Sequence, residues 1–393
     1  MAGPLKGMKI LDFSALLPGP FGTMILGDLG AEVLKVEAPN RPDLMRFAPP
    51  YDGGESSMHH VINRNKKSIG INLKFPEGVE LVKKLVRAYD IMIEQFRPGV
   101  MEKLGVAYET LKKENPRLIY CSITGYGQTG PYRDRAGHDI NYLSTSSIPS
   151  FSHRNGERPF PQAVQIADVG AGSYQAVVAI LAAVIHREKT GEGQYIDVSM
   201  TDGAVSWITH HAPYFLIDGK SPGAEDAFLS GGVHFYDYYE TKDGRFMSVG
   251  SIEPQFYAEL CRGLDREDLK TRQNVDAEDT IELKAELRKI FSGKTQKEWI
   301  EIFAPLDACV EPVLTMGEMC DHPHTRARKM VVEVKKPDGT PQKQIASPFK
   351  LSATPPEIRS VGPKMGEHTD EAMKAVGYSE KEIQALREKG VVA

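Results

Sequence analysis

The chain has 393 residues, of which 41% are hydrophobic and 26% are charged, as in an ordinary soluble protein. This length allows two domains with a substantial core. A formal net charge of −5 argues against a nucleic-acid-binding surface, although a local basic patch for a phosphorylated ligand remains compatible with it. We therefore expect a globular protein of two domains that has no nucleic-acid partner.

Cysteine usage and hydropathy indicate a reducing compartment and no membrane span. The four cysteines lie far apart and form no CxxC pair, as is typical of a cytoplasmic protein: Cys121, Cys261, Cys309 and Cys320. The longest apolar run, residues 176–185, is much shorter than the ~20 residues of a membrane-spanning helix. The first seven residues lack the apolar core of a signal peptide. We expect a cytoplasmic protein without a membrane partner.

The first 120 residues alternate short apolar runs with amphipathic segments. A turn at residues 16–20 leads into a predicted helix that ends near residue 30. A second helix is predicted where Val79, Val82, Leu85 and Val86 share one face. Strands are predicted at residues 8–13, 33–37, 91–94 and 118–121. This order indicates a parallel, doubly wound α/β sheet. The first turn lacks the GxGxxG fingerprint, so a nicotinamide cofactor is not indicated.

The chain continues with an almost wholly apolar segment, residues 173–187, which predicts a buried helix, and with a strand at residues 194–198. Residues 218–223 have the composition of a linker. Beyond them we expect hairpins around residues 242–244 and 337–340, and helices at 281–291, 296–303, 369–376 and 380–389. Ser379 and Glu382 have the spacing of a capping box.

Two short segments carry residues that are suited to proton transfer. His138 follows Gly137, and Asp168 precedes a glycine-containing stretch and the apolar segment. Histidine titrates near neutral pH, and burial can raise the pKa of a carboxyl group into the same range. If a helix begins at His138, backbone N–H groups at Asp139 and its neighbours can stabilise an enolate oxygen. A structural alternative is that Asp139 and Asp168 are helix N-caps and that His138 is a bystander.

Other polar segments also have two interpretations. Glu253 can orient His138 through the second ring nitrogen, or it can be a carboxylate in the first turn of a helix. Residues 63–68 and 95–99 supply cations that suit nucleotide phosphates, or they form a solvated charged face. His322 and His324 have no neighbouring cysteine or carboxylate pattern, so no metal site is predicted.

Several stretches together resemble the family III CoA-transferase superfamily. They are distributed along the whole chain, at residues 18–20, 25–33, 35–37, 63–68, 96–100, 124–131, 193–194, 202–203 and 366–369. Within this superfamily, the complete GHDINY sequence at residues 137–142 and the segment 252–257 resemble the α-methylacyl-CoA racemase branch. Segment 307–313 is similar to both the racemases and the transferases.

The resemblance implies an isomerase that inverts the α-carbon of an acyl-CoA of lipid metabolism. His138 and Asp168 would face opposite sides of this carbon, Glu253 would orient His138, and the backbone at Asp139 would hold the enolate oxygen. CoA would be bound by Arg64, Lys66, Arg97, Tyr126 and Gly127, and the acyl part would contact Tyr142 and Arg154. CoA is part of the substrate, so no separate cofactor is expected.

The resemblance also implies an interlocked homodimer. Each chain would have a large Rossmann-like domain with a parallel sheet and a smaller α+β domain. Residues 1–217 and the returning segment 326–393 would form the large domain, residues 218–228 a linker, and residues 229–325 the smaller domain. Active sites would lie between the large domain of one subunit and the smaller domain of the other, so that Glu253 reaches His138 across the dimer.

The sequence departs from the racemase pattern at two places. Glu-Ala-Pro at residues 37–39 stands where racemases carry a basic residue, so the nucleotide contacts are expected to differ. Segment 144–158 is more polar than an aliphatic pocket requires, and we expect Arg154 to bind a carboxylate or other polar group of the acyl chain. Two other functions use the same residues: CoA transfer through an anhydride at Asp168, and non-catalytic binding of acyl-CoA.

Overall fold

The computed structural model describes residues 3–393 and divides the chain into two compact units. The larger unit contains the chain up to Ser146, Gln162–Trp207 and His324–Ala393, and the smaller unit contains Ser147–Pro161 and Ile208–Pro323. The expected linker, residues 218–228, therefore lies inside the smaller unit. Residues 147–161 belong there too, because Arg154 forms ion pairs with Glu225 and Asp237.

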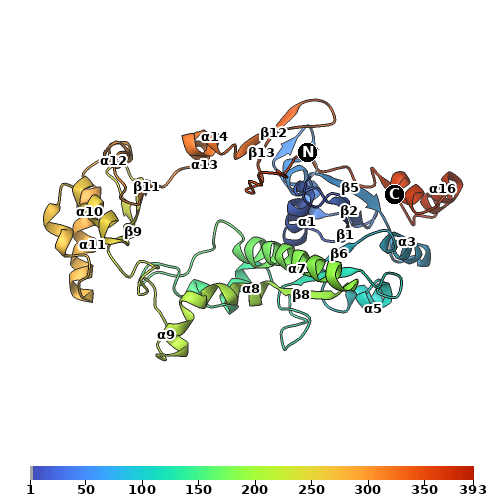
Figure 1. Cartoon of the computed structure of the whole chain (residues 1–393), viewed down its shortest axis with the longest axis horizontal. Coiled ribbons are helices and arrows are strands. Elements are labelled where there is room, and N and C mark those ends of the chain that lie inside the picture. Colours follow the sequence, from blue (N-terminus) through green and yellow to red (C-terminus); the bar gives the residue numbers. More distant parts are fainter. Residues whose placement is uncertain (1–2) are drawn as a thin grey trace. The chain divides into compact units, whose positions relative to one another are not determined.

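A six-stranded parallel sheet forms the centre of the larger unit (Figure 1). In spatial order its strands are β5 (Lys66–Gly70), β2 (Glu32–Glu37), β1 (Lys9–Asp12), β6 (Ile91–Glu94), β7 (Ile119–Thr124) and β8 (Tyr195–Ser199), and every neighbouring pair is parallel. The chain runs outward from β1 through β2 to β5, and afterwards in the other direction from β6 through β7 to β8. The carboxyl ends of β1 and β6 therefore form a topological switch point, where sheets of this kind bind ligands.

Helices cover both faces of this sheet, as the order of predicted elements indicates. One face carries α1 (Pro18–Asp28) and α7 (Gln175–Thr190). The other face shares a core with α3 (Pro76–Val86), α4 (Val100–Lys103), α5 (Tyr108–Leu111), α15 (Thr369–Ala375) and α16 (Glu380–Glu388). Val82, Leu85 and Val86 are buried, as the pattern in α3 predicts. The capping box of Ser379 and Glu382 at the start of α16 is confirmed.

The other elements of this part of the chain are shorter. They are η1 (Leu44–Phe47), β3 (Tyr51–Asp52), β4 (Glu55–Ser56), α2 (Ser57–Ile62), α6 (Asp139–Thr145), α8 (Met200–Trp207), α14 (Pro323–Ala327), β12 (Val331–Lys335) and β13 (Pro341–Ile345). Strands β12 and β13 form the hairpin expected around residues 337–340.

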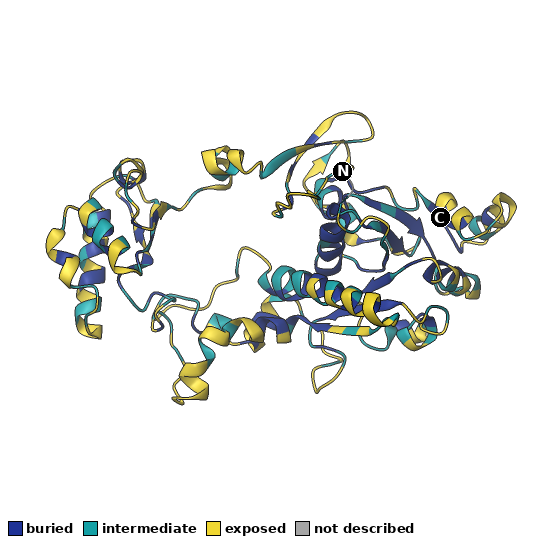
Figure 2. Cartoon of the chain, viewed as in Figure 1, coloured by how far each residue is buried: buried dark blue, intermediate teal, exposed yellow. Residues whose placement is uncertain are grey.

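The apolar helix is longer than predicted, and only one of its faces is enclosed. It begins as a π-helix, η3 (Ala167–Tyr174), and continues directly as α7. Val178 and Ile185 are 67% and 59% exposed on the outer side of α7 (Figure 2), so the prediction of a buried helix is wrong for this face. The whole stretch Ala167–Thr190 is long and apolar enough to cross a membrane, a test that core helices of soluble proteins also pass. Its other face packs against α1 and β7.

The smaller unit is built around an antiparallel sheet of β9 (Tyr236–Glu240), β10 (Phe246–Gly250) and β11 (Val310–Pro312), with β10 in the middle. The predicted hairpin around residues 242–244 joins β9 to β10. Aromatic rings of Tyr239, Phe291 and Trp299 pack together in its core. The helical elements are η2 (Ile148–Ser150), η4 (Ile208–His210), α9 (Ala212–Leu216), α10 (Pro254–Gly263), η5 (Glu267–Thr271), α11 (Ala277–Phe291), α12 (Gln296–Phe303) and α13 (Met316–Asp321).

Candidate active site

A cavity of about 570 Å³ opens at the switch point of the larger unit. It is lined by the loops that follow β1, β6 and β7, by the start of α6 and by the first turn of η3. His138 and Asp168 both line it, although they lie far apart in the chain. The fold thus brings together the two residues that the sequence singled out for proton transfer.

His138 occupies the N-cap position of α6, where its backbone is extended (φ −132°, ψ 176°). Its backbone N–H donates to Oδ1 of Asn141 at 3.0 Å, which defines where the helix begins. The residue is exposed. The N-cap residue of this helix is therefore His138 and not Asp139, as the structural alternative had it.

Tyr142 supports the backbone that carries His138. Its hydroxyl donates to the carbonyl of Gly137, and its ring packs edge-on against Tyr126, with the centroids 5.2 Å apart. A Cβ atom at Gly125 or Gly137 would lie 2.3 Å or 2.6 Å from this ring, so only glycine permits the close approach. Tyr126 and Tyr142 both line the cavity.

Asp139 connects the two segments of the site. Its Oδ1 atom accepts hydrogen bonds from the backbone N–H groups of Ala167 at 2.7 Å and of Asp168 at 3.0 Å. These donors belong to the start of η3, where N–H groups have no partner within the helix. Asp139 is therefore a cap, but of the helix that carries Asp168, and the sequence did not predict this contact.

Asp168 lies half-buried in the first turn of η3, for which Ile166 is the N-cap residue. Burial raises the pKa of its carboxyl group to about 6, the charge of Asp139 acts in the same direction, and His138 opposes the shift. A carboxyl group with this pKa can both accept and donate a proton near neutral pH.

Four arginines make the cavity electropositive: Arg41, Arg97, Arg133 and Arg135. Asp168 is the one carboxylate among the described residues that line it. The sequence pointed to Arg97 and missed Arg41, which lies just beyond the Glu-Ala-Pro stretch and lines the cavity. Gly127 is buried beside the cavity, and its N–H donates to Thr124 Oγ1 at 3.0 Å.

Two cations that were expected to bind CoA lie in the core of the larger unit instead. Nη2 of Arg64 lies 2.6 Å from Asp28, and Nζ of Lys66 lies 3.0 Å from Asp12. Both side chains are buried, and neither lines the cavity. Buried charges require a partner, and each of these cations already has one. Their positions favour structural ion pairs over the expected contacts with CoA.

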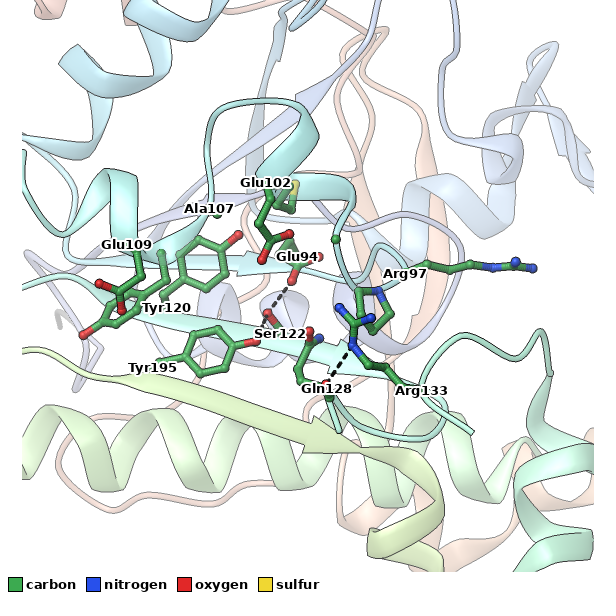
Figure 3. Close-up of a pocket in the computed structure, with 14 residues that line it drawn as sticks. Glu94, Arg97, Glu102, Ala107, Glu109, Tyr120, Ser122, Gln128, Arg133 and Tyr195 are labelled. Carbon is green, nitrogen blue, oxygen red and sulfur yellow. Dashed lines mark hydrogen bonds between the residues drawn. The ribbon is translucent and has the colours of Figure 1, made fainter. Parts of the chain in front are cut away.

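A smaller pocket of about 330 Å³ shares Arg97 and Arg133 with the cavity. In it, the hydroxyl of Tyr195 donates to Ser122 at 2.9 Å, and Ser122 donates to Glu94 (Figure 3). Glu94 also accepts the backbone N–H of Phe96 at 2.8 Å. Burial raises the pKa of Glu94 to about 7. This carboxyl group anchors the loop that carries Arg97, whose side chain extends away from Glu94.

The two remaining site candidates lie in the smaller unit. Glu253 is exposed at the N-cap position of α10, and its side chain makes no capping hydrogen bond. Arg154 Nη1 lies 2.5 Å from Glu225 and 2.8 Å from Asp237. Two carboxylates thus neutralise this cation, and the arrangement does not favour the expected binding of a substrate carboxylate.

Known proteins share both the sequence and the fold. A family model described as CoA-transferase family III matches residues 5–369. Alpha-methylacyl-CoA racemase of Mus musculus is 38% identical over 396 residues, covering 99% of this chain and 97% of the relative. Succinyl-CoA:glutarate CoA-transferase of Homo sapiens is 35% identical over 402 residues, covering 99% of this chain and 90% of the relative. The crystal structure of a CAIB/BAIF family protein from Brucella suis has a TM-score of 0.83 at 30% identity, covering 96% of this chain and 100% of that one. The chain therefore belongs to CoA-transferase family III.

Proposed function

We propose that this enzyme epimerises the α-carbon of a 2-methyl- or 2-substituted acyl-CoA by two-base proton transfer. The observation that carries the proposal is that His138 and Asp168 line one cavity while the pKa of Asp168 is raised to about 6. A group that must both remove and return a proton works best when its pKa is near the working pH. The 38% identity to the mouse racemase supports the same reaction.

In one direction His138 removes the α-proton and Asp168 delivers a proton to the opposite face of the carbon. In the other direction the two residues exchange roles. Between these steps the thioester oxygen carries the enolate charge. Backbone N–H groups beside Asp139 would donate to this oxygen, in the manner of an oxyanion hole. The α-carbon ends with the inverted configuration, and all other bonds are unchanged.

The CoA portion would bind through the arginines of the cavity. Exposed Arg41 and Arg97 can each form a paired donor contact with a phosphate. Because the cavity-lining residues carry four arginines and one carboxylate, the field there attracts a polyanion.

We infer that the chain forms a homodimer in which Glu253 of the partner subunit orients His138. Val178 and Ile185 present an apolar stripe on α7, and such a face is typical of a surface that contacts protein. A mixture of H138A and E253A chains tests this arrangement. If the residues act across the dimer, each mixed dimer regains one intact site, and activity returns after the chains are exchanged. If they act within one chain, activity does not return.

A second function is favoured by the 35% identity to a human CoA-transferase. In this reaction the Asp168 carboxylate attacks the thioester carbonyl, the CoA thiolate leaves, and an aspartyl anhydride forms. The acceptor carboxylate then attacks the Asp168 carbonyl of this anhydride and displaces the donor acid, which leaves as a carboxylate. The CoA thiolate attacks the acceptor acyl carbonyl of the new anhydride, which releases the Asp168 carboxylate and the new acyl-CoA.

One experiment separates these functions. The enzyme is incubated with single epimers of 2-methylacyl-CoA in D2O, and deuterium incorporation at the α-carbon is followed by NMR. Exchange that is lost in both H138A and D168A supports epimerisation. Transfer of CoA to a free acid, without exchange and with loss in D168A alone, would mean that the protein is a transferase. Binding without either reaction would leave an acyl-CoA-binding protein.

A further inference from the structure

We propose that Asp139 is a positioning residue that ties the segment of one proton-transfer residue to the helix of the other. Its backbone directly follows His138, and its side chain holds the turn that carries Asp168. One side chain would therefore set both where Asp168 lies relative to His138 and how readily Asp168 holds a proton. This inference rests on the proposed epimerisation and deepens it.

The geometry of η3 explains why such a residue is needed. In a π-helix the N–H groups bond to carbonyls five residues earlier, so the first turn contains even more unpaired donors than an α-helix does. Oδ1 of Asp139 accepts two of these donors, from Ala167 and Asp168. On the carboxyl side of Asp168 the turn is held by Ser173, whose hydroxyl donates to the carbonyls of Asp168 at 3.1 Å and Pro18 at 2.6 Å.

The charge of Asp139 has a second consequence. The titratable groups that act on Asp168 are Asp139 and His138, and Tyr142 of the same helix is also coupled to it. Arg97, from the loop after β6, lines the same cavity. Among these groups Asp139 is the negative one, and its charge disfavours ionisation of Asp168. Removing this charge should therefore lower the pKa of Asp168.

The two roles can be separated by substitution. Both hydrogen bonds end on the same oxygen atom, so the single carbonyl oxygen of asparagine in Asp139→Asn can accept them while the charge is lost. In D139N we expect the acidic limb of the pH–rate profile to move to lower pH, because the charge is lost while both hydrogen bonds remain. In D139A both bonds are lost, and we expect the exchange rate to fall roughly 10- to 100-fold through misplacement of Asp168.

Asp276 provides a matched control in the smaller unit. It is the N-cap residue of α11 and accepts the N–H of Asp279 at 2.9 Å. D276A should lower the melting temperature as a lost cap does, D276N should keep the cap, and neither should move the pH profile. Unchanged pH profiles and rates in D139N and D139A, with normal exchange in the wild type, would overturn the inference while leaving the proposed function intact.

The pKa of Asp168 can also be measured directly, without substrate turnover, so that the inference is tested independently of activity. The titration of Asp168 is followed by NMR in protein carrying ¹³C-labelled aspartate, with D168N used to assign its signal. A lower pKa of Asp168 in D139N than in the wild type supports the inference, and an unchanged pKa overturns it. A wild-type enzyme that catalyses no exchange would instead contradict the proposed function.

Discussion

His138 and Asp168 line the same cavity, although one lies at the start of α6 and the other in the first turn of η3. They are held there by polar contacts between the two helix starts, through the side chain of Asp139. The cavity lies where the sheet changes direction between β1 and β6, so it can open between loops without exposing the core. Proton transfer to both faces of one carbon requires two bases in fixed positions, and the first turns of two helices provide such positions.

The rate of epimerisation should depend on pH in the same way for both epimers. In the proposed epimerisation, the active enzyme holds one proton on the pair of His138 and Asp168, whichever residue begins the reaction. Because the pKa of Asp168 is about 6, lowering the pH below this value places protons on both groups and slows the reaction. At high pH the pair loses its shared proton, and the rate falls again. We expect matching bell-shaped profiles of kcat/KM, measured by circular dichroism with each epimer. A rate that is constant between about pH 5 and pH 8 would contradict this.

Arg41 and Arg97 should act on substrate binding and much less on chemistry. Charge-assisted hydrogen bonds to phosphate contribute about 1.5–3 kcal/mol each, so R41A and R97A should each raise KM for acyl-CoA roughly 10- to 100-fold. We expect kcat to change little and the effect to shrink as salt is added. R87A is a suitable control, because Arg87 pairs with Glu114 on the surface, away from the cavity. Equal KM values in all three variants would show that the nucleotide binds elsewhere.

Arg64 should stabilise the fold and have little influence on the affinity for CoA. Its pair with Asp28 is buried, and removing one partner leaves an unpaired charge in the core. We expect R64A and D28A to lower the free energy of unfolding by about 3–5 kcal/mol, measured in urea. R117A, which removes an exposed pair with Glu188, should cost less than about 1 kcal/mol. An R64A enzyme of normal stability and raised KM would restore the expectation that Arg64 binds CoA.

Glu94 should make stability depend on pH. Its pKa rises from 4.5 to about 7 in the folded protein, so the folded state holds this proton more tightly than the unfolded chain does. The stabilisation is full below pH 4.5 and is lost as the pH rises through about 7. Glutamine stays neutral at every pH. The free energy of unfolding of E94Q, relative to that of the wild type, should therefore rise by up to about 3 kcal/mol from low to high pH. Urea unfolding at both extremes measures this difference.

Glu109 lines the same pocket as Glu94 but is exposed, so E109Q serves as the control. A pH-dependent gain in E94Q that E109Q does not share would assign the effect to Glu94. An E94Q variant with the same relative stability at both pH values would mean that folding does not raise the pKa of Glu94.

Local patterns in the sequence predicted most of the larger unit. Alternating apolar runs and amphipathic segments indicated β1, β2, β6, β7 and β8 and their arrangement in a parallel sheet. Strand β5 was missed because its polar residues are buried by pairing, as Lys66 is with Asp12, and no apolar run marks it. The outer face of α7 was expected to be buried, because composition alone does not show which side of a helix finds a partner.

The sequence by itself determined most of the longer elements, the candidate pair of His138 and Asp168, and the racemase-like motif around them, because these are local patterns. Only the tertiary structure decided that Asp139 caps the helix of Asp168, that Arg41 reaches the cavity and that Arg64 does not. The physical reason is that a charged side chain has several partners of similar energy available to it. The partner that such a side chain contacts depends on where distant loops end at the edge of the sheet. The hydrophobic periodicity of the sequence does not indicate these positions.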